Sequence, residues 1–327
     1  MYLITGGAGF IGSNLVAELS ARGHPVVVCD WLRSDERWRN LVKHEVVDIV
    51  LPEDLLAWLD QHGSKLHAVF HMGAISATTE TDVDLITQRN IRYTLDLLEW
   101  CTRKRHRLIY ASSAATYGDG GAGFDDDFSC EALARLRPLN AYGWSKHLVD
   151  RRVARLLEQR DPLPPQWVGL KFFNVFGPNE YHKRTMRSVI AVNYESVARG
   201  EPLRLFKSYR ADYGDGGQLR DFIYVKDCVS VMTWLLEHPE VSGLFNVGTG
   251  HARSWLDLGR ALFAALGQAE SIEFIDMPET LRAKYQYYTE ARMQRLRAAG
   301  YHQPFTTLED AVAEYVQRYL KADDPYR

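Results

Sequence analysis

The sequence TGGAGFIG occupies residues 5–12, between the short apolar run at residues 2–5 and an amphipathic segment at residues 12–22. Gly6, Gly9 and Gly12 suit a tight turn, a close approach of the backbone to a pyrophosphate, and close packing of a helix on a strand. The free N–H groups at the start of that helix and the positive end of its dipole would face the phosphates. This strand–turn–helix pattern predicts a dinucleotide site; the alternative is an ordinary turn between a strand and a helix.

Asp30 ends the second apolar run, where a carboxylate can bind the ribose 2′-hydroxyl of a dinucleotide. An acid at this position favours NAD, because it repels the 2′-phosphate of NADP. Arg33, Arg37 and Arg39 follow at once, however, and one of them could pair with that phosphate through two hydrogen bonds. The alternative for these arginines is a solvated loop, so the residues alone leave NAD and NADP open.

Apolar runs alternate with helical patterns through the first half of the chain. We expect buried strands at residues 2–5, 25–30, 68–71, 108–112 and 168–174, and amphipathic helices at residues 12–22, 82–102 and 142–158. This alternation predicts an α/β fold with a Rossmann-type, doubly wound parallel sheet that is covered by helices on both faces.

The pattern loosens after residue 177. We expect a helix at residues 185–198, an exposed loop at 209–218, strand-like runs at 221–225 and 244–247, and a helix at 227–237. Thr306 and Glu309 have the spacing of a capping box for a last helix that ends near residue 320. We therefore expect residues 1–177 to form the dinucleotide-binding domain and residues 178–327 a smaller α/β substrate domain, with the chain partly crossing back.

Composition excludes several classes of protein. The 327 residues carry a net charge of −3, which argues against a bulk nucleic-acid binder. No apolar stretch approaches the ~18–20 residues that span a bilayer, and the N-terminus lacks the pattern of a signal peptide. The cysteines contain no CxxC pair, so neither a metal site nor a disulfide framework is supported. We expect a soluble, cytoplasmic protein that binds no membrane, metal or nucleic acid.

The sequence YGWSK at residues 142–146 places the Tyr142 phenol and the Lys146 ammonium on one helical face. A tyrosine with a pKa of about 10 is a poor base at neutral pH. Lowering that pKa by about 3 units requires about 4 kcal/mol, which a lysine and an oxidised nicotinamide could supply together. Ser113 follows a buried strand at the sheet edge where ligands bind, so it can hold a reacting oxygen beside the tyrosine.

With the glycine turn, the strand-end serine and YxxxK in this order, the chain resembles the extended short-chain dehydrogenase/reductase family. Members of this family mostly epimerise, dehydrate or reduce nucleotide sugars. The resemblance implies that Ser113, Tyr142 and Lys146 form the catalytic triad and that Asn90 supports the active-site helix. In the family's sugar 4,6-dehydratases an Asp-Glu pair follows the serine or threonine. Here Ala114 and Ala115 stand instead, and methyl groups cannot shuttle protons, so redox or epimerisation chemistry is expected rather than loss of water.

Further stretches resemble the branch of this family that epimerises an ADP-linked heptose at C6. They are FHMGA at residues 70–74, SATTE at 76–80, FNVFGPNEYHK at 173–183 and KYQ at 284–286. The resemblance implies an ADP-heptose substrate, a second acid/base at Lys183, a tightly held NADP (with NAD possible) and a cytoplasmic homo-oligomer, a pentamer. The branch often has Asn after the strand-end aspartate, where Trp31 stands here.

The resemblance also implies two sets of binding residues. For the cofactor they are Gly6, Gly9, Phe10, Ile11, Gly12, Asp30, Trp31, Arg37, Met72, Gly73, Ala74, Ser76, Asn90, Lys146, Val175 and Lys183. For the substrate they are Ser113, Asn174, Thr185, Phe206, Lys207, Ser208, Tyr209, Arg220 and Tyr285.

Simpler interpretations stand beside these roles. Lys183 could be a solvated loop cation, Arg220 could form a surface ion pair with a neighbour such as Asp221, and His71 is better explained as a packed histidine than as a catalyst. The whole chain could instead be another epimerase or reductase of the family, such as a UDP-hexose 4-epimerase. It could also be a non-catalytic dinucleotide-sensing protein, although such proteins typically lack the tyrosine–lysine pair.

Overall fold

The computed structural model describes residues 1–282 and 285–327, so Lys284 of the KYQ stretch lies outside the described residues. Its larger sheet has seven strands in the order β10-β6-β5-β4-β1-β2-β3. All neighbours in this sheet are parallel. The strands are β1 (Tyr2–Thr5), β2 (Val26–Cys29), β3 (Asp48–Val50), β4 (Ala68–His71), β5 (Arg107–Ser113), β6 (Trp167–Phe172) and β10 (Gly243–Val247). The predicted doubly wound parallel sheet is confirmed, and its strand order reverses at β1, between β2 and β4.

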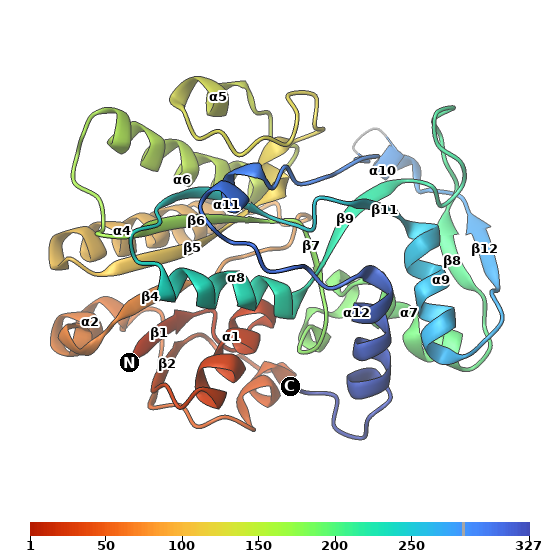
Figure 1. The fold of residues 1–327 in the computed structure, drawn as a ribbon, viewed down its shortest axis with the longest axis horizontal. Coiled ribbons are helices and arrows are strands. Elements are labelled where there is room, and N and C mark those ends of the chain that lie inside the picture. The colour runs from red at the N-terminus through yellow and green to blue at the C-terminus, as the bar shows by residue number, and fades with distance from the viewer. Residues whose placement is uncertain (283–284) are drawn as a thin grey trace.

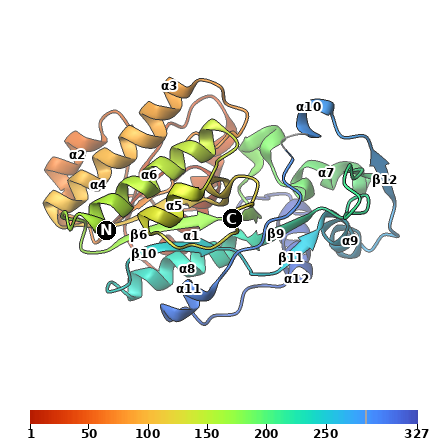
Figure 2. The same ribbon diagram turned by 90° about the horizontal axis from the view of Figure 1, so that it is seen from above.

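Helices cover both faces of this sheet because successive strand residues point to opposite sides. On β1, Leu3 packs in one apolar cluster with residues of α2 (Leu55–His62), α4 (Tyr93–Lys104) and α6 (Ala141–Glu158). Its neighbour Ile4 packs in another with residues of α1 (Phe10–Ala21), α8 (Val225–Glu237) and α11 (Gln294–Ala298). Figure 2 shows these two helical layers above and below the sheet. Full burial of one such side chain contributes about 1.5–3 kcal/mol.

A smaller group of elements lies beside the carboxyl end of the large sheet, on the right in Figure 1. It contains a three-stranded sheet in the order β11-β9-β7 and a two-stranded sheet of β12 and β8. Phe222, Leu258, Leu262 and Val312 belong to its core. Its elements are β7 (Asn174–Phe176), α7 (Val189–Ala198), β8 (Leu203–Phe206), β9 (Leu219–Tyr224), β11 (Ala252–Ser254), α9 (Trp255–Leu266), β12 (Ile272–Ile275) and α12 (Leu308–Tyr315). The chain returns to the large sheet in between, through α8 and β10.

Short helical segments complete the described chain. They are η1 (Glu36–Leu41), η2 (Gly63–Lys65), α3 (Val83–Ile86), η3 (Thr87–Arg92), η4 (Ala114–Tyr117), α5 (Cys130–Arg135), η5 (Tyr181–Met186), α10 (Glu279–Arg282) and η6 (Val316–Leu320). The helix expected at residues 82–102 is therefore α3, a π-helical turn at η3, and α4.

Three predicted boundaries were wrong for identifiable reasons. The last helix is capped one residue later than predicted: Thr307 accepts from the Asp310 N–H, whereas Thr306 donates to Asp227. The helix expected from residue 185 begins at Val189, because the Ser188 side chain caps it. The strand expected at residues 168–174 is divided at Phe173 between β6 of the large sheet and β7 of the small one.

Candidate active site

The glycine turn lies against the end of β4. Gly6 has a φ of +64°, and a Cβ there would lie 2.5 Å from the Cα of Gly73. A Cβ at Gly12 would lie 2.2 Å from the carbonyl oxygen of Gly6. Glycine is therefore required at both positions, since a side chain would separate the turn from β4 or from the helix. Gly9 is the N-cap of α1 and leaves the first N–H groups of that helix without a side-chain cap, as a phosphate site requires.

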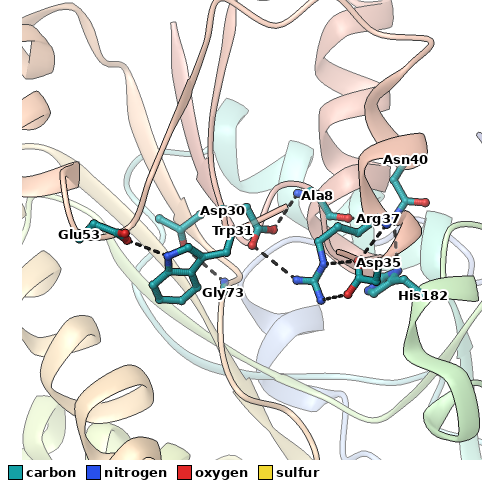
Figure 3. Close-up of polar contacts among 10 residues, drawn as sticks. Ala8, Asp30, Trp31, Asp35, Arg37, Asn40, Glu53, Gly73 and His182 are labelled. Atoms are coloured by element: carbon teal, nitrogen blue, oxygen red, sulfur yellow. Dashed lines mark hydrogen bonds and ion pairs between the residues drawn. The ribbon is translucent and has the colours of Figure 1, made fainter. Parts of the chain in front are cut away.

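Asp30 stands immediately after β2, beside Arg37 (Figure 3). Its Oδ2 accepts a hydrogen bond from the Ala8 N–H at 3.0 Å, and its Oδ1 lies 3.7 Å from the Arg37 guanidinium. Burial raises the pKa of Asp30, and Arg37 opposes that rise. Asp35 holds Arg37 through two hydrogen bonds of 2.8 Å. The Asp30 carboxyl and the Arg37 guanidinium thus lie side by side at the end of β2. Arg33 and Arg39, by contrast, are exposed.

Trp31 stands where the resembling branch of the family often has Asn, and two side chains contact its indole. Its Nε1 donates to Glu53 at 2.7 Å, as Figure 3 shows, and the guanidinium of Arg89 lies 4.1 Å from the centre of its ring. These two contacts orient the indole in the residue that follows Asp30.

Asn40 joins the glycine turn to the segment that carries Lys183, and sequence analysis missed it. Its Nδ2 donates to the Ala8 carbonyl at 2.8 Å and to the Asn179 carbonyl at 3.2 Å. The same nitrogen lies 3.4 Å from Nδ1 of His182 (Figure 3). No motif marks Asn40, because its role depends on residues far away in the sequence.

The start of α6 brings Tyr142 to Ser113. Asn140 caps the helix by accepting from the Gly143 N–H at 2.8 Å, which places Tyr142 in the first turn. A Cβ at Gly143 would lie 2.6 Å from the Ala115 carbonyl oxygen, so that turn rests directly on η4. Burial raises the pKa of Tyr142, and a hydrogen bond with Ser113 opposes the rise. Within the described chain, the pKa of Tyr142 therefore stays above its usual value. The Asn140 cap, three residues before Gly143, was a signal in the sequence.

Lys146 follows one turn later and is 3% exposed. Burial lowers its pKa to about 8, against the opposing charge of Asp150. No hydrogen bond joins its ammonium to residues 1–282 or 285–327, which leaves it available to a ligand. Asn90 instead uses its whole amide within the chain, with Ile75 N–H at 2.8 Å, Ile75 carbonyl at 2.9 Å and Ser145 Oγ at 3.1 Å. It therefore ties the loop after β4 to the active-site helix.

The loop after β4 carries the other residues expected at the cofactor. The Gly73 N–H lies 3.3 Å from Thr5 Oγ1, and Met72 is half-buried, while Ala74 and Ser76 are exposed. His71 is held at both ring nitrogens, 2.6 Å from Thr5 Oγ1 and 2.8 Å from Thr94 Oγ1. Burial lowers its pKa to about 3. A neutral, fully engaged imidazole supports the packing interpretation of His71.

Lys183 lies in η5, with its ammonium 5.2 Å from the centre of the Phe10 ring at the start of α1. Burial lowers its pKa, and the nearby Glu180 opposes that shift. The residue is half-buried. Within the described residues no hydrogen bond joins it to Tyr142 or Ser113. Thr185 is exposed, two residues further along η5.

Arg220 is a buried cation without an acidic partner in the described chain. Its guanidinium lies 5.2 Å from the ring centre of Tyr285 and 5.8 Å from that of Trp255, and it donates to the Leu219 and Gln286 carbonyls. The alternative of an ion pair with Asp221 is wrong, because Asp221 accepts instead from backbone N–H groups of Thr249, Gly250 and Ala291.

The other residues expected at the substrate, together with Val175 of the cofactor set, lie on β7, at the end of β8 and in the segment that follows it. Phe206 packs edge-on against Tyr285, with ring centres 6.4 Å apart. Tyr209 lies under Arg282 at 3.9 Å, and both Lys207 and Tyr209 contact Asp276. The Ser208 N–H, just before the exposed loop at residues 209–218, donates to Asp215 within that loop. Asn174 and Val175 stand on β7, paired with Phe222 and Ile223.

Comparisons with known proteins agree with this geometry. The profile of the NAD dependent epimerase/dehydratase family matches residues 2–248. The chain belongs to this family. An ADP-L-glycero-D-manno-heptose-6-epimerase of Nitratidesulfovibrio vulgaris is 52% identical over 330 residues, covering 100% of both chains. The protein of the same name from Fusobacterium nucleatum is 44% identical, again over 100% of both chains.

Solved structures of this epimerase/dehydratase family resemble the whole fold. The Helicobacter pylori ADP-L-glycero-D-manno-heptose-6-epimerase has a TM-score of 0.79 at 28% identity, covering 97% of this chain and 95% of that one. The Thermus thermophilus UDP-glucose 4-epimerase, in complex with NAD, has a TM-score of 0.74 at 26% identity, covering 98% and 99%. Over the part of the chain that the structure describes, no helix is both long and apolar enough to cross a membrane.

Proposed function

We propose that this chain interconverts ADP-D-glycero-D-manno-heptose and ADP-L-glycero-D-manno-heptose by epimerisation at C6. The identity of 52% over the whole length of the relative that carries this name is the observation on which the proposal rests. The set of Ser113, Tyr142 and Lys146 at the carboxyl edge of the sheet supports a catalytic rather than a sensing protein. We further propose that residues 1–177 bind the dinucleotide and residues 178–327 the sugar nucleotide, in a cytoplasmic homo-oligomer, a pentamer.

The dinucleotide is NADP in this proposal, with NAD as the alternative. The residues fit such a group: the close contact of Gly6 and Gly73 leaves no room for side chains, and the start of α1 is uncapped. Arg37 is positioned by Asp35 beside Asp30, where its guanidinium can pair with a 2′-phosphate and offset the repulsion from the carboxylate. A dinucleotide held there would supply the acceptor and donor of the C6 hydride.

Two residues handle the proton of the C6 hydroxyl. The two epimers place that hydroxyl on different sides of the carbon, so one base cannot reach both protons at hydrogen-bond distance. Tyr142 serves one epimer and Lys183 the other, through a planar 6-keto sugar that turns about its C5–C6 bond between the two hydride transfers. Ser113 holds the reacting oxygen, and Lys146 stabilises the Tyr142 phenolate. Arg220, framed by Tyr285 and Trp255, binds the pyrophosphate.

A substrate comparison tests the proposal. Purified protein receives ADP-D-glycero-D-manno-heptose or UDP-galactose without added cofactor, and the epimers are separated by chromatography. We expect interconversion of the ADP-heptose alone. Turnover of UDP-galactose alone would assign a hexose 4-epimerase instead. A protein that binds NADP but converts no sugar nucleotide would favour the dinucleotide-sensing alternative.

A further inference from the structure

A groove on the outer side of α6 lies apart from the candidate active site. Its volume is about 850 Å³, and it is bordered by α5, by the segment between α5 and α6, and by α6 itself. Figure 2 shows α5 lying along α6. Trp144 and His147 line this groove, whereas Tyr142 and Lys146 of the same helix do not. The groove is therefore a separate feature of the molecule.

The groove carries a strong excess of positive charge. Arg137, Arg151, Arg152 and Arg155 line it, against the single carboxylate of Glu131. None of these four arginines forms an ion pair within residues 1–282 and 285–327. Like charges one helical turn apart, such as those of Arg151 and Arg155, destabilise a helix. Since the one carboxylate in the lining cannot balance four guanidinium groups, an anion from outside would relieve this repulsion.

His147 provides an independent observation in the same groove. The residue is 5% exposed, and its buried Nδ1 has no hydrogen-bond partner in the described part of the chain. An unpaired buried polar atom costs free energy. Asp150, on the same helix, is by contrast fully engaged by Ser112 and Lys171. Burial lowers the pKa of His147 to about 4, so its imidazole is neutral at neutral pH.

The rest of the lining is apolar. It consists of Cys130, Ala134, Leu136, Pro138, Leu148 and the partly exposed Trp144. Four guanidinium groups beside an apolar surface suit a ligand that has both an anionic group and an apolar body. The volume falls within the roughly 300–1,000 Å³ of small-molecule sites.

We propose that this groove binds an organic phosphate, with its phosphoryl group held by Arg151 and Arg155 and its apolar body against Trp144. Guanidinium groups bind phosphate through paired hydrogen bonds, which favours a phosphate over a less well matched anion. The site differs from the proposed sugar-nucleotide site, whose pyrophosphate is assigned to Arg220.

Calorimetric titration with naphthyl phosphate tests this inference. The full chain is used in its native assembly, saturated with NADP so that the dinucleotide site is occupied. We expect one binding event per chain, weakened about tenfold or more in the double variant Arg151→Gln, Arg155→Gln. Arg220→Gln, which alters only the proposed sugar-nucleotide site, should leave this event unchanged. The double variant Arg92→Gln, Arg103→Gln removes the same charge at exposed positions and serves as the control.

A third variant tests whether the apolar body of the ligand contributes to binding separately from its phosphoryl group. Trp144→Ala should weaken naphthyl phosphate binding while leaving the weaker binding of inorganic phosphate unchanged. The proposal is overturned if naphthyl phosphate does not bind, if only Arg220→Gln abolishes binding, or if the control variant weakens it equally. Binding of phosphatidylglycerol vesicles without binding of naphthyl phosphate would also overturn it, because the arginines would then serve a membrane surface.

Discussion

Arg220 and Asp221 are adjacent on β9, and both are buried. Within the described chain, only the charge of Asp221 is offset by hydrogen-bond donors. Asp221 receives backbone hydrogen bonds from three directions, including those from Thr249 and Ala291. Arg220 meets only carbonyl oxygens and aromatic rings. A buried cation without an anion is costly, so the pyrophosphate of a bound sugar nucleotide would supply the missing charge. Of these two neighbouring residues, Asp221 therefore has a structural role, whereas Arg220 is the candidate for binding a ligand.

The two-base proposal makes a prediction at the residue scale. Tyr142→Phe and Lys183→Met should each lower kcat by about 10²-fold or more, because each removes a proton-transfer group. The double variant should be inactive while retaining bound NADP, measured by absorbance of the purified protein. Lys321→Met, at an exposed position, should keep full activity. Full turnover in the double variant would rule out these two residues as the acid/base pair.

Lys146 gives the reaction a pH dependence. Burial lowers its pKa to about 8, so the free protein loses this ammonium charge as the pH rises through that value. Tyr142, whose pKa burial raises, then lacks the cation that would stabilise its phenolate. We expect kcat/KM to fall above about pH 8. In Lys146→Arg, whose side chain stays charged, the fall should move to higher pH even if the overall rate is lower. An unchanged profile in Lys146→Arg would contradict this role.

At the scale of elements, the contact of α6 with η4 sets the position of Tyr142 relative to Ser113. Alanine normally stabilises a helix relative to glycine by about 1 kcal/mol. Gly143→Ala should do the reverse and cost about 1–3 kcal/mol, because its Cβ would lie 2.6 Å from the Ala115 carbonyl. The first turn would move away from Ser113, so kcat should fall as well. Urea denaturation and steady-state rates measure both effects.

Gly214→Ala is the matched control, since nothing lies within 4 Å of a Cβ there. That variant should change stability by no more than about 0.5 kcal/mol. Equal stability and activity in Gly143→Ala and the native protein would show that α6 has room to accommodate a methyl group, contrary to this account.

Elements were predictable from the sequence where local pattern determines them. The strand–turn–helix at residues 2–22 and the YxxxK helix follow from apolar spacing and glycine placement, and both are present. Boundaries decided by distant partners were not predictable. Thr306 has the right spacing for a cap, but its hydroxyl donates to Asp227 on α8, so the cap passes to Thr307. The link from Asn40 to Asn179 has no local signal for the same reason.

At the scale of the whole molecule, the candidate site lies along the seam between the large sheet and the smaller group of elements. The glycine turn, Ser113 and Tyr142 come from the large sheet and its helices, whereas Arg220 and Phe206 come from the smaller group. Lys183 connects the two, with its ammonium over Phe10 at the start of α1. Sequence motifs predicted each set separately. Contacts between segments far apart in the chain, such as that of Lys183 with Phe10, were not predictable from these motifs.

Internal hydride return at C6 is tested most directly by the fate of the C6 hydrogen. Purified protein converts ADP-D-glycero-D-manno-heptose in D2O without added cofactor, and mass spectrometry measures deuterium on carbon in both epimers. A hydride that leaves and returns within one closed site does not exchange with solvent, so we expect the L-epimer to form with no deuterium at C6. Deuterium at C6 of the product would instead show direct removal of the carbon-bound proton, and would contradict the mechanism.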